Sequence, residues 1–125
     1  VNLMNNYFRD RGFEKAHAIQ MDLFDIGAVV KLLKQLESVK PRIAFIFNVV
    51  DALEFFEKDF SKKFLLEISN ECEQIILSFP TESLSGKTKF QVLRKWLTDF
   101  IDKNFEVIDS FIISGEKFLI LKNKK

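Results

Sequence analysis

The sequence contains few of the residues that form disulfides, metal centres or tight turns. Its 125 residues include one cysteine, two prolines, four glycines and a single histidine. One cysteine excludes an intrachain disulfide and a cysteine-based metal cluster, so we expect Cys72 to be a packing residue in a reducing, cytoplasmic compartment. No set of His, Cys, Asp or Glu side chains has the spacing of metal ligands, and we expect no metal.

Long apolar runs and a strong net charge are also lacking. No run approaches the roughly 20 apolar residues of a membrane-spanning helix, so no membrane partner is expected. The net charge is +1, so any binding of nucleic acid must come from local clusters of basic residues. The length fits one domain over residues 1–125. Because the chain begins with Val1 instead of Met, we expect residues upstream of it.

Phenylalanine, in contrast, is abundant. There are fifteen Phe residues, one Tyr and one Trp, within a hydrophobic fraction of 47%. Phe has bulk but no polar group, so most of these rings are expected in a core.

The apolar pattern predicts alternating helices and strands. Helices are expected over residues 2–12, 26–38, 55–72 and 90–103, and strands over residues 16–24, 42–50, 74–79, 105–113 and 117–122. Alternation of helices with buried strands indicates an α/β fold, a parallel sheet with helices on both faces. The last two strands flank Ser114-Gly115-Glu116, which predicts a hairpin with an antiparallel strand at one edge.

The stretch from Ile75 to Lys87 is the most informative part of the chain. An apolar run stops at Pro80 and is followed by a polar loop that ends in Gly86-Lys87. This pattern is typical of a buried parallel strand that delivers a loop to the carboxyl edge of the sheet, where ligands of such sheets bind.

Residues 78–87 read Ser-Phe-Pro-Thr-Glu-Ser-Leu-Ser-Gly-Lys. They resemble the Ser-Phe-Pro-x-x-Ser-Leu-x-Gly-[Lys/Arg] segment of the small-subunit ribosomal RNA guanine-N7 methyltransferases that confer aminoglycoside resistance. The resemblance runs from Ile43 to Lys122 and implies a Rossmann-like class I methyltransferase that uses S-adenosylmethionine. The chain departs from the family pattern at Asn48, where the family has Lys, at Phe90-Gln91-Val92, where it has Gly-Met-Glu, and at Lys95, where it has Tyr.

The resemblance implies a cofactor site. Asp22 is expected to accept a hydrogen bond from the adenine amino group, and the backbone N–H of Leu23 to meet a ring nitrogen. Asn48 is expected nearest the transferable methyl group, with Val49 lining the cleft. In the alternative, Asp22 or Asp25 caps the helix near residue 26, Asn48 satisfies the loop backbone, and Val49 belongs to the core.

The resemblance also implies a substrate site for ribosomal RNA or the small ribosomal subunit. The expected substrate contacts are Pro80, Thr81, Ser83, Ser85, Lys87, Lys89, Arg94 and Lys95. In the alternative, the same residues form a solvated loop and helix face. No residue is assigned as catalytic, and His17 is expected to be a structural residue within its strand.

Two family features are missing from the sequence. The fold uses a glycine-rich turn after its first strand and an acidic residue after its second, and neither is present here. Those strands would lie between residues 16–24 and 42–50, and without them unpaired backbone groups would cost about 1–3 kcal/mol each. We therefore expect the chain to be the C-terminal portion of a longer enzyme, or to complete its sheet with another polypeptide. Alone it is expected to be inactive and to bind cofactor weakly.

Two other interpretations remain open. The chain could be a non-catalytic Rossmann-like binding or assembly module that has lost the cofactor half. It could also be an unrelated α/β domain such as a receiver domain, which the lack of an acidic cluster after a first strand disfavours.

Overall fold

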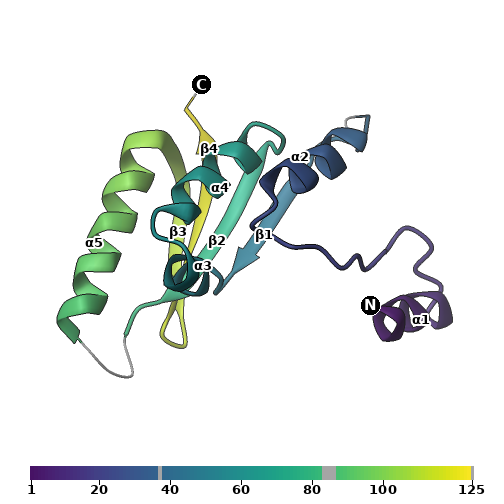
Figure 1. The fold of residues 1–125 in the computed structure, drawn as a ribbon, viewed down its shortest axis with the longest axis horizontal. Helices are drawn as coiled ribbons and strands as arrows, with labels where there is room; N and C mark the ends of the chain where they lie inside the picture. The colour runs from purple at the N-terminus through teal and green to yellow at the C-terminus, as the bar shows by residue number, and fades with distance from the viewer. Residues whose placement is uncertain (37, 83–86, 125) are drawn as a thin grey trace.

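The computed structural model describes residues 1–36, 38–82 and 87–124 and shows an open α/β sheet (Figure 1). The described helices are α1 (Asn2–Asp10), α2 (Ile26–Gln35), α3 (Val50–Phe56), α4 (Phe60–Ser69) and α5 (Lys87–Asn104). The strands are β1 (Ile43–Phe47), β2 (Gln74–Pro80), β3 (Phe105–Ile113) and β4 (Glu116–Asn123).

The four strands lie in the order β1-β2-β4-β3. β1 and β2 are parallel, with Phe47 opposite Ser78, which confirms that residues 74–79 form an interior strand parallel to residues 42–50. β4 is antiparallel to both β2 and β3, which confirms the hairpin. The reversed strand was expected at the edge of the sheet. It lies instead one place inside the edge, because β3 is the outermost strand. The tight turn at Ser114 (φ 51°) and Gly115 (φ 78°) folds β4 back between β2 and β3.

The core lies between the sheet and the helices that cover one of its faces. From β2, Ile75, Leu77 and Phe79 are at most 3% exposed, and they alternate with residues on the opposite face, as a strand requires. From α5, Leu97 and Ile101 are at most 1% exposed. Cys72 packs against this core, which confirms its expected packing role.

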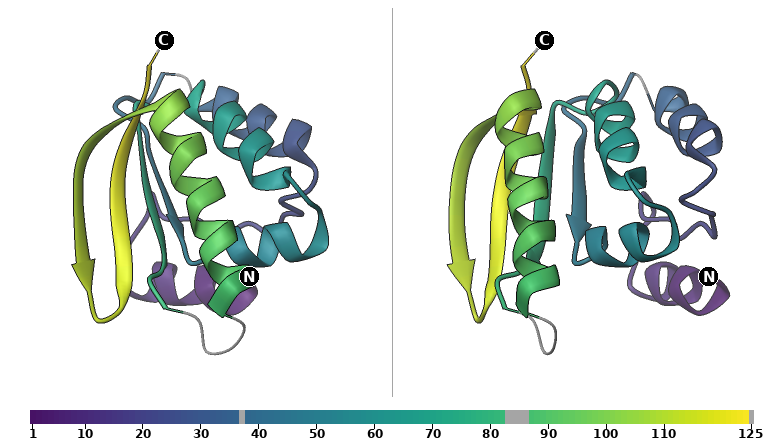
Figure 2. Two further views of the ribbon diagram at one scale, coloured as in Figure 1. Left: turned by 90° about the vertical axis from the view of Figure 1, so that its left-hand side faces the viewer. Right: turned by 60° about the vertical axis from the view of Figure 1, so that its left-hand side comes forward.

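The opposite face of the sheet is not covered as predicted. Figure 2 shows α3, α4 and α5 gathered on one side of the sheet. On β1 the residues of the other face, Ile43, Phe45 and Phe47, are 43%, 63% and 46% exposed. The expectation of helices on both faces is therefore wrong for the described part of the chain, and Phe45 and Phe47 stand on this uncovered face.

The strand expected over residues 16–24 is not formed. Residues 16–22 have no regular structure, and α1 before them contributes no buried residue. The backbone of Ala18 pairs instead with the side-chain amide of Asn5, which donates to its carbonyl (3.0 Å) and accepts from its N–H (2.8 Å). A strand needs a neighbouring strand for its backbone groups, and no described strand lies beside this segment.

The helix expected over residues 55–72 is divided into α3 and α4. Asp59 adopts a left-handed conformation (φ 64°) between them. The carboxylate of Glu54 accepts hydrogen bonds from the backbone N–H groups of Asp59 and Ser61, so it satisfies donors at the start of α4. Helical periodicity predicts Phe56 and Val92 on the inner faces of the helices expected over residues 55–72 and 90–103, but they are 75% and 66% exposed.

Candidate ligand site at the carboxyl edge of the sheet

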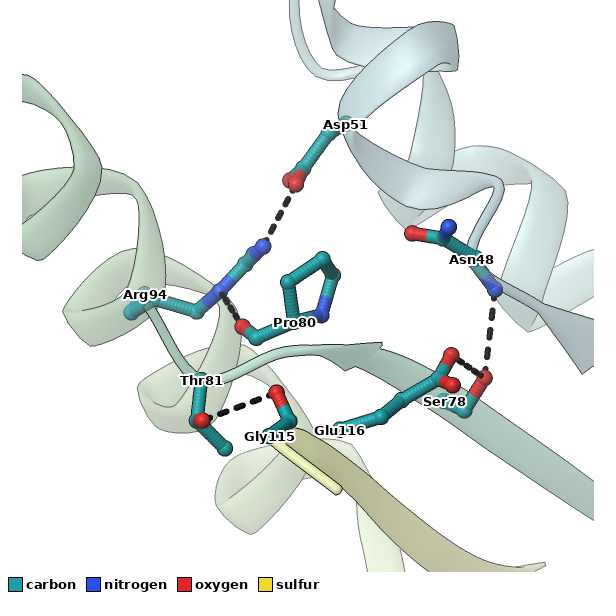
Figure 3. Close-up of polar contacts among 8 residues, drawn as sticks. All are labelled: Asn48, Asp51, Ser78, Pro80, Thr81, Arg94, Gly115 and Glu116. Atoms are coloured by element: carbon teal, nitrogen blue, oxygen red, sulfur yellow. Dashed lines mark hydrogen bonds and ion pairs between the residues drawn. The ribbon is translucent and has the colours of Figure 1, made fainter. Parts of the chain in front are cut away.

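Several polar side chains meet where β1 and β2 end and β4 begins (Figure 3). Because β4 runs against β2, its first residue, Glu116, lies opposite Pro80 at the end of β2. The polar residues of this edge are Asn48, Asp51, Ser78, Thr81, Arg94 and Glu116. Open α/β sheets bind their ligands at this edge.

Asn48 follows β1 directly and has a left-handed backbone (φ 55°). Its N–H donates to the carbonyl (3.0 Å) and to the hydroxyl (3.2 Å) of Ser78. Its exposed side-chain amide makes no hydrogen bond with a described residue, so the amide is not used to satisfy the loop backbone. A donor and an acceptor therefore remain available for a ligand at the end of the strand.

Ser78 and Glu116 form the centre of the edge. The Ser78 side chain is 0% exposed, and its hydroxyl donates a 2.7 Å hydrogen bond to Glu116 Oε1. The same hydroxyl oxygen accepts the N–H of Asn48, so both the donor and an acceptor of Ser78 are engaged. This arrangement fixes the position of the Glu116 carboxylate.

Arg94 links α5 to the strand ends. Its Nε donates to the carbonyl of Pro80 (3.0 Å), and its NH2 group donates to Asp51 Oδ2 in the first turn of α3 (2.5 Å). The guanidinium carbon lies 4.8 Å from the centre of the Phe79 ring. With a side chain 12% exposed, Arg94 is largely an internal connector, and its predicted contact with substrate stays a prediction.

The remaining predicted substrate residues differ in their positions. Thr81 donates its hydroxyl to the carbonyl of Gly115 (2.8 Å), which joins the end of β2 to the hairpin turn. Lys95 is on the exposed side of α5, where it pairs with Asp99 at 3.0 Å. Lys87 and Lys89 begin α5, but their side chains lie outside the described part, as do Ser83 and Ser85.

The predicted adenine contacts lie in the turn before α2. Asp22 Oδ1 accepts from the N–H of Phe24 (2.9 Å), and Asp25 caps α2 by accepting from the N–H of Ala28 (3.1 Å). The helix-cap alternative therefore holds for Asp25. Leu23 is 36% exposed, and the cofactor role of this pair stays a prediction. Val49 packs against the core, as its alternative supposed.

The sequence reasoning missed two of the edge residues, Asp51 and Glu116. Asp51 stands one turn beyond a strand whose end was predicted, and the chain reversal in β4 brings Glu116 to the same place. In the sequence pattern, Glu116 stands out only as part of a hairpin turn. The alternation along β4, which puts Glu116, Phe118 and Ile120 on one face, was the available signal.

A hollow is present away from this edge. A half-open hollow of about 790 Å³ lies between α1 and residues 12–19, with Asn5, Phe8 and His17 among its walls. It includes none of the residues of the carboxyl edge. Within the described ranges, no group of His, Cys, Asp and Glu could hold a metal ion, and no helix is long and apolar enough to cross a membrane.

Comparison with solved structures supports the resemblance seen in the sequence. The fold is similar to the 16S rRNA methyltransferase RmtF in complex with S-adenosyl-L-homocysteine, with a TM-score of 0.69, 21% identity, and coverage of 99% of this chain and 44% of that one. An rRNA methylase from Escherichia coli gives a TM-score of 0.53 and 23% identity over 66% of this chain and 31% of that one. The 16S rRNA methylase ArmA gives a TM-score of 0.52 and 18% identity over 72% of this chain and 44% of that one.

Comparison by sequence, unlike comparison by structure, finds no relative. No family model matches the chain, and no curated relative matches it. The chain spans less than half the length of the solved methyltransferases that it resembles. In fold, these 125 residues are similar to part of these solved 16S rRNA methyltransferases, and they form an α/β sheet with a reversed strand next to its edge.

Proposed function

We propose that this chain is part of an S-adenosylmethionine-dependent methyltransferase that acts on a guanine of ribosomal RNA. The observation that carries the proposal is the parallel pair β1 and β2, followed by the reversed β4, which together assemble a polar edge at Asn48, Ser78 and Glu116. The same fold occurs in solved 16S rRNA methyltransferases, one of them bound to S-adenosyl-L-homocysteine.

One residue of the edge, Asn48, and one residue of the turn before α2, Asp22, offer groups that suit parts of the cofactor. Asn48 offers an unengaged amide at the end of β1, and Asp22 offers a carboxylate that could accept from the adenine amino group. The chain has no glycine-rich turn to hold the amino-acid end and no acidic residue placed to hold the ribose. The fit is therefore to the adenine and methyl positions alone.

The chemistry needs little acid–base help from the protein. The cofactor supplies an electrophilic methyl group on sulfur, whose departure as a neutral thioether requires no proton. The guanine N7 lone pair is a nucleophile without deprotonation. The role left to the described residues is to align nucleophile and methyl group, which can by itself account for a large part of a rate enhancement.

We further propose that additional strands complete the sheet beside β1. β1 is a terminal strand whose outer backbone groups have no described partner strand, and its Phe45 is 63% exposed. An open edge and an apolar face of this kind are normally covered in soluble proteins. The covering residues would belong to the upstream half of the enzyme or to a partner chain, and these 125 residues alone are expected to bind cofactor weakly.

Calorimetric titration tests the proposal. S-adenosyl-L-homocysteine should bind saturably to the full-length natural protein and compete with S-adenosylmethionine. The absence of heat and of competition would contradict the proposal. It would favour instead the non-catalytic module that has lost its cofactor half, an alternative supported by the missing glycine-rich turn.

A further inference from the structure

We propose that Glu116 is a specificity-determining residue that recognises guanine by accepting hydrogen bonds from its N1–H and 2-amino groups. This inference rests on the proposed function and adds to it the residue that selects the base. It starts from the position of Glu116, the first residue of β4, opposite Pro80 at the carboxyl edge.

The Glu116 carboxylate is held in place by Ser78, on the neighbouring strand β2. Ser78 is fully buried and donates its only hydroxyl proton to Glu116 Oε1 at 2.7 Å. Because the Ser78 oxygen already accepts the N–H of Asn48, the hydroxyl is oriented toward the carboxylate. Glu116 therefore presents itself to a ligand as an acceptor in a defined position.

The Glu116 carboxylate can also accept further hydrogen bonds. An ionised carboxylate can accept about four hydrogen bonds, and the described residues supply only the one from Ser78. None of the four described ion pairs includes Glu116. The half-buried carboxylate stands at the edge where ligands of such sheets bind.

The aromatic neighbours of Glu116 favour a flat aromatic ligand. The strand positions next to Ser78 carry Phe47 and Phe118, whose ring centres are 5.7 Å apart, and Phe118 stacks on Phe111 at 5.2 Å. These rings stand on the same face of the sheet as Glu116, because Glu116 and Phe118 are two residues apart in β4. Aromatic rings near an oriented polar group are the usual surroundings of a base taken out of its stack.

Guanine matches a carboxylate better than the other bases do. Its N1–H and 2-amino groups are two adjacent donors, whereas adenine, cytosine and uracil each place an acceptor beside their donor on that edge. The N7 atom lies on the opposite edge of the base, so a guanine held through N1–H and N2 leaves its nucleophile free. A site built to accept a donor also discriminates against analogues that lack it.

The test compares nucleotides that differ in one group. Guanosine and inosine 5′-monophosphates share a phosphate, a ribose and N7, but inosine lacks the 2-amino group. Each is titrated into the ¹⁵N-labelled full-length protein, and the amide resonances of Asn48, Ser78 and Glu116 are followed. We expect guanosine monophosphate to shift these resonances and to bind about tenfold more tightly than inosine monophosphate, as the loss of one charge-assisted hydrogen bond predicts.

The Glu116→Gln variant completes the test. Its amide oxygen can still accept from Ser78, so the fold should be retained, but its amino group opposes the donors of guanine. We expect guanosine monophosphate to bind about tenfold more weakly and the preference over inosine monophosphate to disappear. Glu106→Gln is the matched control, since Glu106 lies at the other end of the hairpin opposite Lys122, and it should keep the preference.

Three results would overturn the inference: equal binding of the two nucleotides to the unaltered protein, an unchanged preference in Glu116→Gln, or no shift of the three resonances. The titration with S-adenosyl-L-homocysteine is separate. Cofactor binding without a preference for guanosine monophosphate would reject the role of Glu116 and keep the proposed function. A preference for guanosine monophosphate without cofactor binding would keep guanine recognition by Glu116 and reject the proposed methyltransferase function.

Discussion

Arg94 and Asp51, which are 43 residues apart in the sequence, are joined by a 2.5 Å hydrogen bond between guanidinium and carboxylate. The bond connects the first half of α5 with the first turn of α3, and the same guanidinium holds the carbonyl of Pro80. The end of β2 at Pro80 is thus joined to α5 and, through Asp51, to α3 at the edge of the candidate site.

Arg94→Ala is expected to destabilise the chain. The Arg94 side chain is 12% exposed, and its loss leaves Asp51 and the carbonyl of Pro80 without their donor. We expect the free energy of unfolding to fall by about 2 kcal/mol, measured by urea denaturation. Lys95→Ala is the control, because Lys95 is 78% exposed and its pair with Asp99 should contribute about 0.5 kcal/mol or less. Equal losses in the two variants would show that the Arg94 contacts add no stability.

Substitutions of Asp22 and Asp25 should distinguish a residue that binds cofactor from a residue that caps a helix. Asp25→Ala removes the cap of α2 and should cost about 1 kcal/mol of stability with unchanged affinity for S-adenosyl-L-homocysteine. If Asp22 accepts from the adenine amino group, Asp22→Ala should lower that affinity about tenfold in the full-length protein. Calorimetry and thermal unfolding of both variants give the comparison. An unchanged affinity in Asp22→Ala would remove the residue from the cofactor site.

The two faces of the sheet should respond differently to truncation. Leu77 is 0% exposed beneath the helices, whereas Phe45 is 63% exposed on the uncovered face. Leu77→Ala should lower the free energy of unfolding by about 3 kcal/mol because it leaves a cavity. Phe45→Ala should lower it by less than about 1 kcal/mol in the isolated chain. Urea denaturation of both variants gives the comparison, and a large loss for Phe45→Ala would mean that this face is already covered.

Glu73 should make the stability of the folded chain depend on pH in the acidic range. Its carboxylate accepts the backbone N–H of Arg42, and this hydrogen bond is the main reason that the pKa of Glu73 is lowered from its ordinary value of 4.5. Because the pKa is lowered on folding, the contribution is present above the unfolded pKa and is lost as the pH falls through the folded pKa. Melting temperatures of the unaltered chain and Glu73→Gln should differ near neutral pH and converge well below that ordinary value. A pH-independent difference would contradict this.

The sequence predicted best those parts of the fold that depend on local pattern. β2, the hairpin and the amphipathic α2 and α5 follow from alternation, turn residues and helical period. Residues 16–24 could not be placed from pattern alone, since a strand forms only with a neighbour and none is described there. The break between α3 and α4 depends on the Glu54 carboxylate, which periodicity does not reveal.

The candidate site was predictable to a smaller extent. Asn48 and Pro80 were identified because each ends a recognisable strand. Glu116 and Asp51 were not, since their place depends on a strand reversal and on a bond between distant helices. The sequence could not reveal that Arg94 pairs with Asp51, because the two residues are on different helices. The positive charge of Arg94 suggested instead an exposed basic patch.

The central claim is methyl transfer to a guanine of ribosomal RNA, and isotope transfer tests it most directly. Small ribosomal subunits are incubated with the full-length protein and S-adenosylmethionine labelled with ¹³C in its methyl group, and the RNA nucleosides are then separated by mass spectrometry. The account predicts labelled 7-methylguanosine that is absent without the protein. Label in no nucleoside, or only in one other than guanosine, would contradict it.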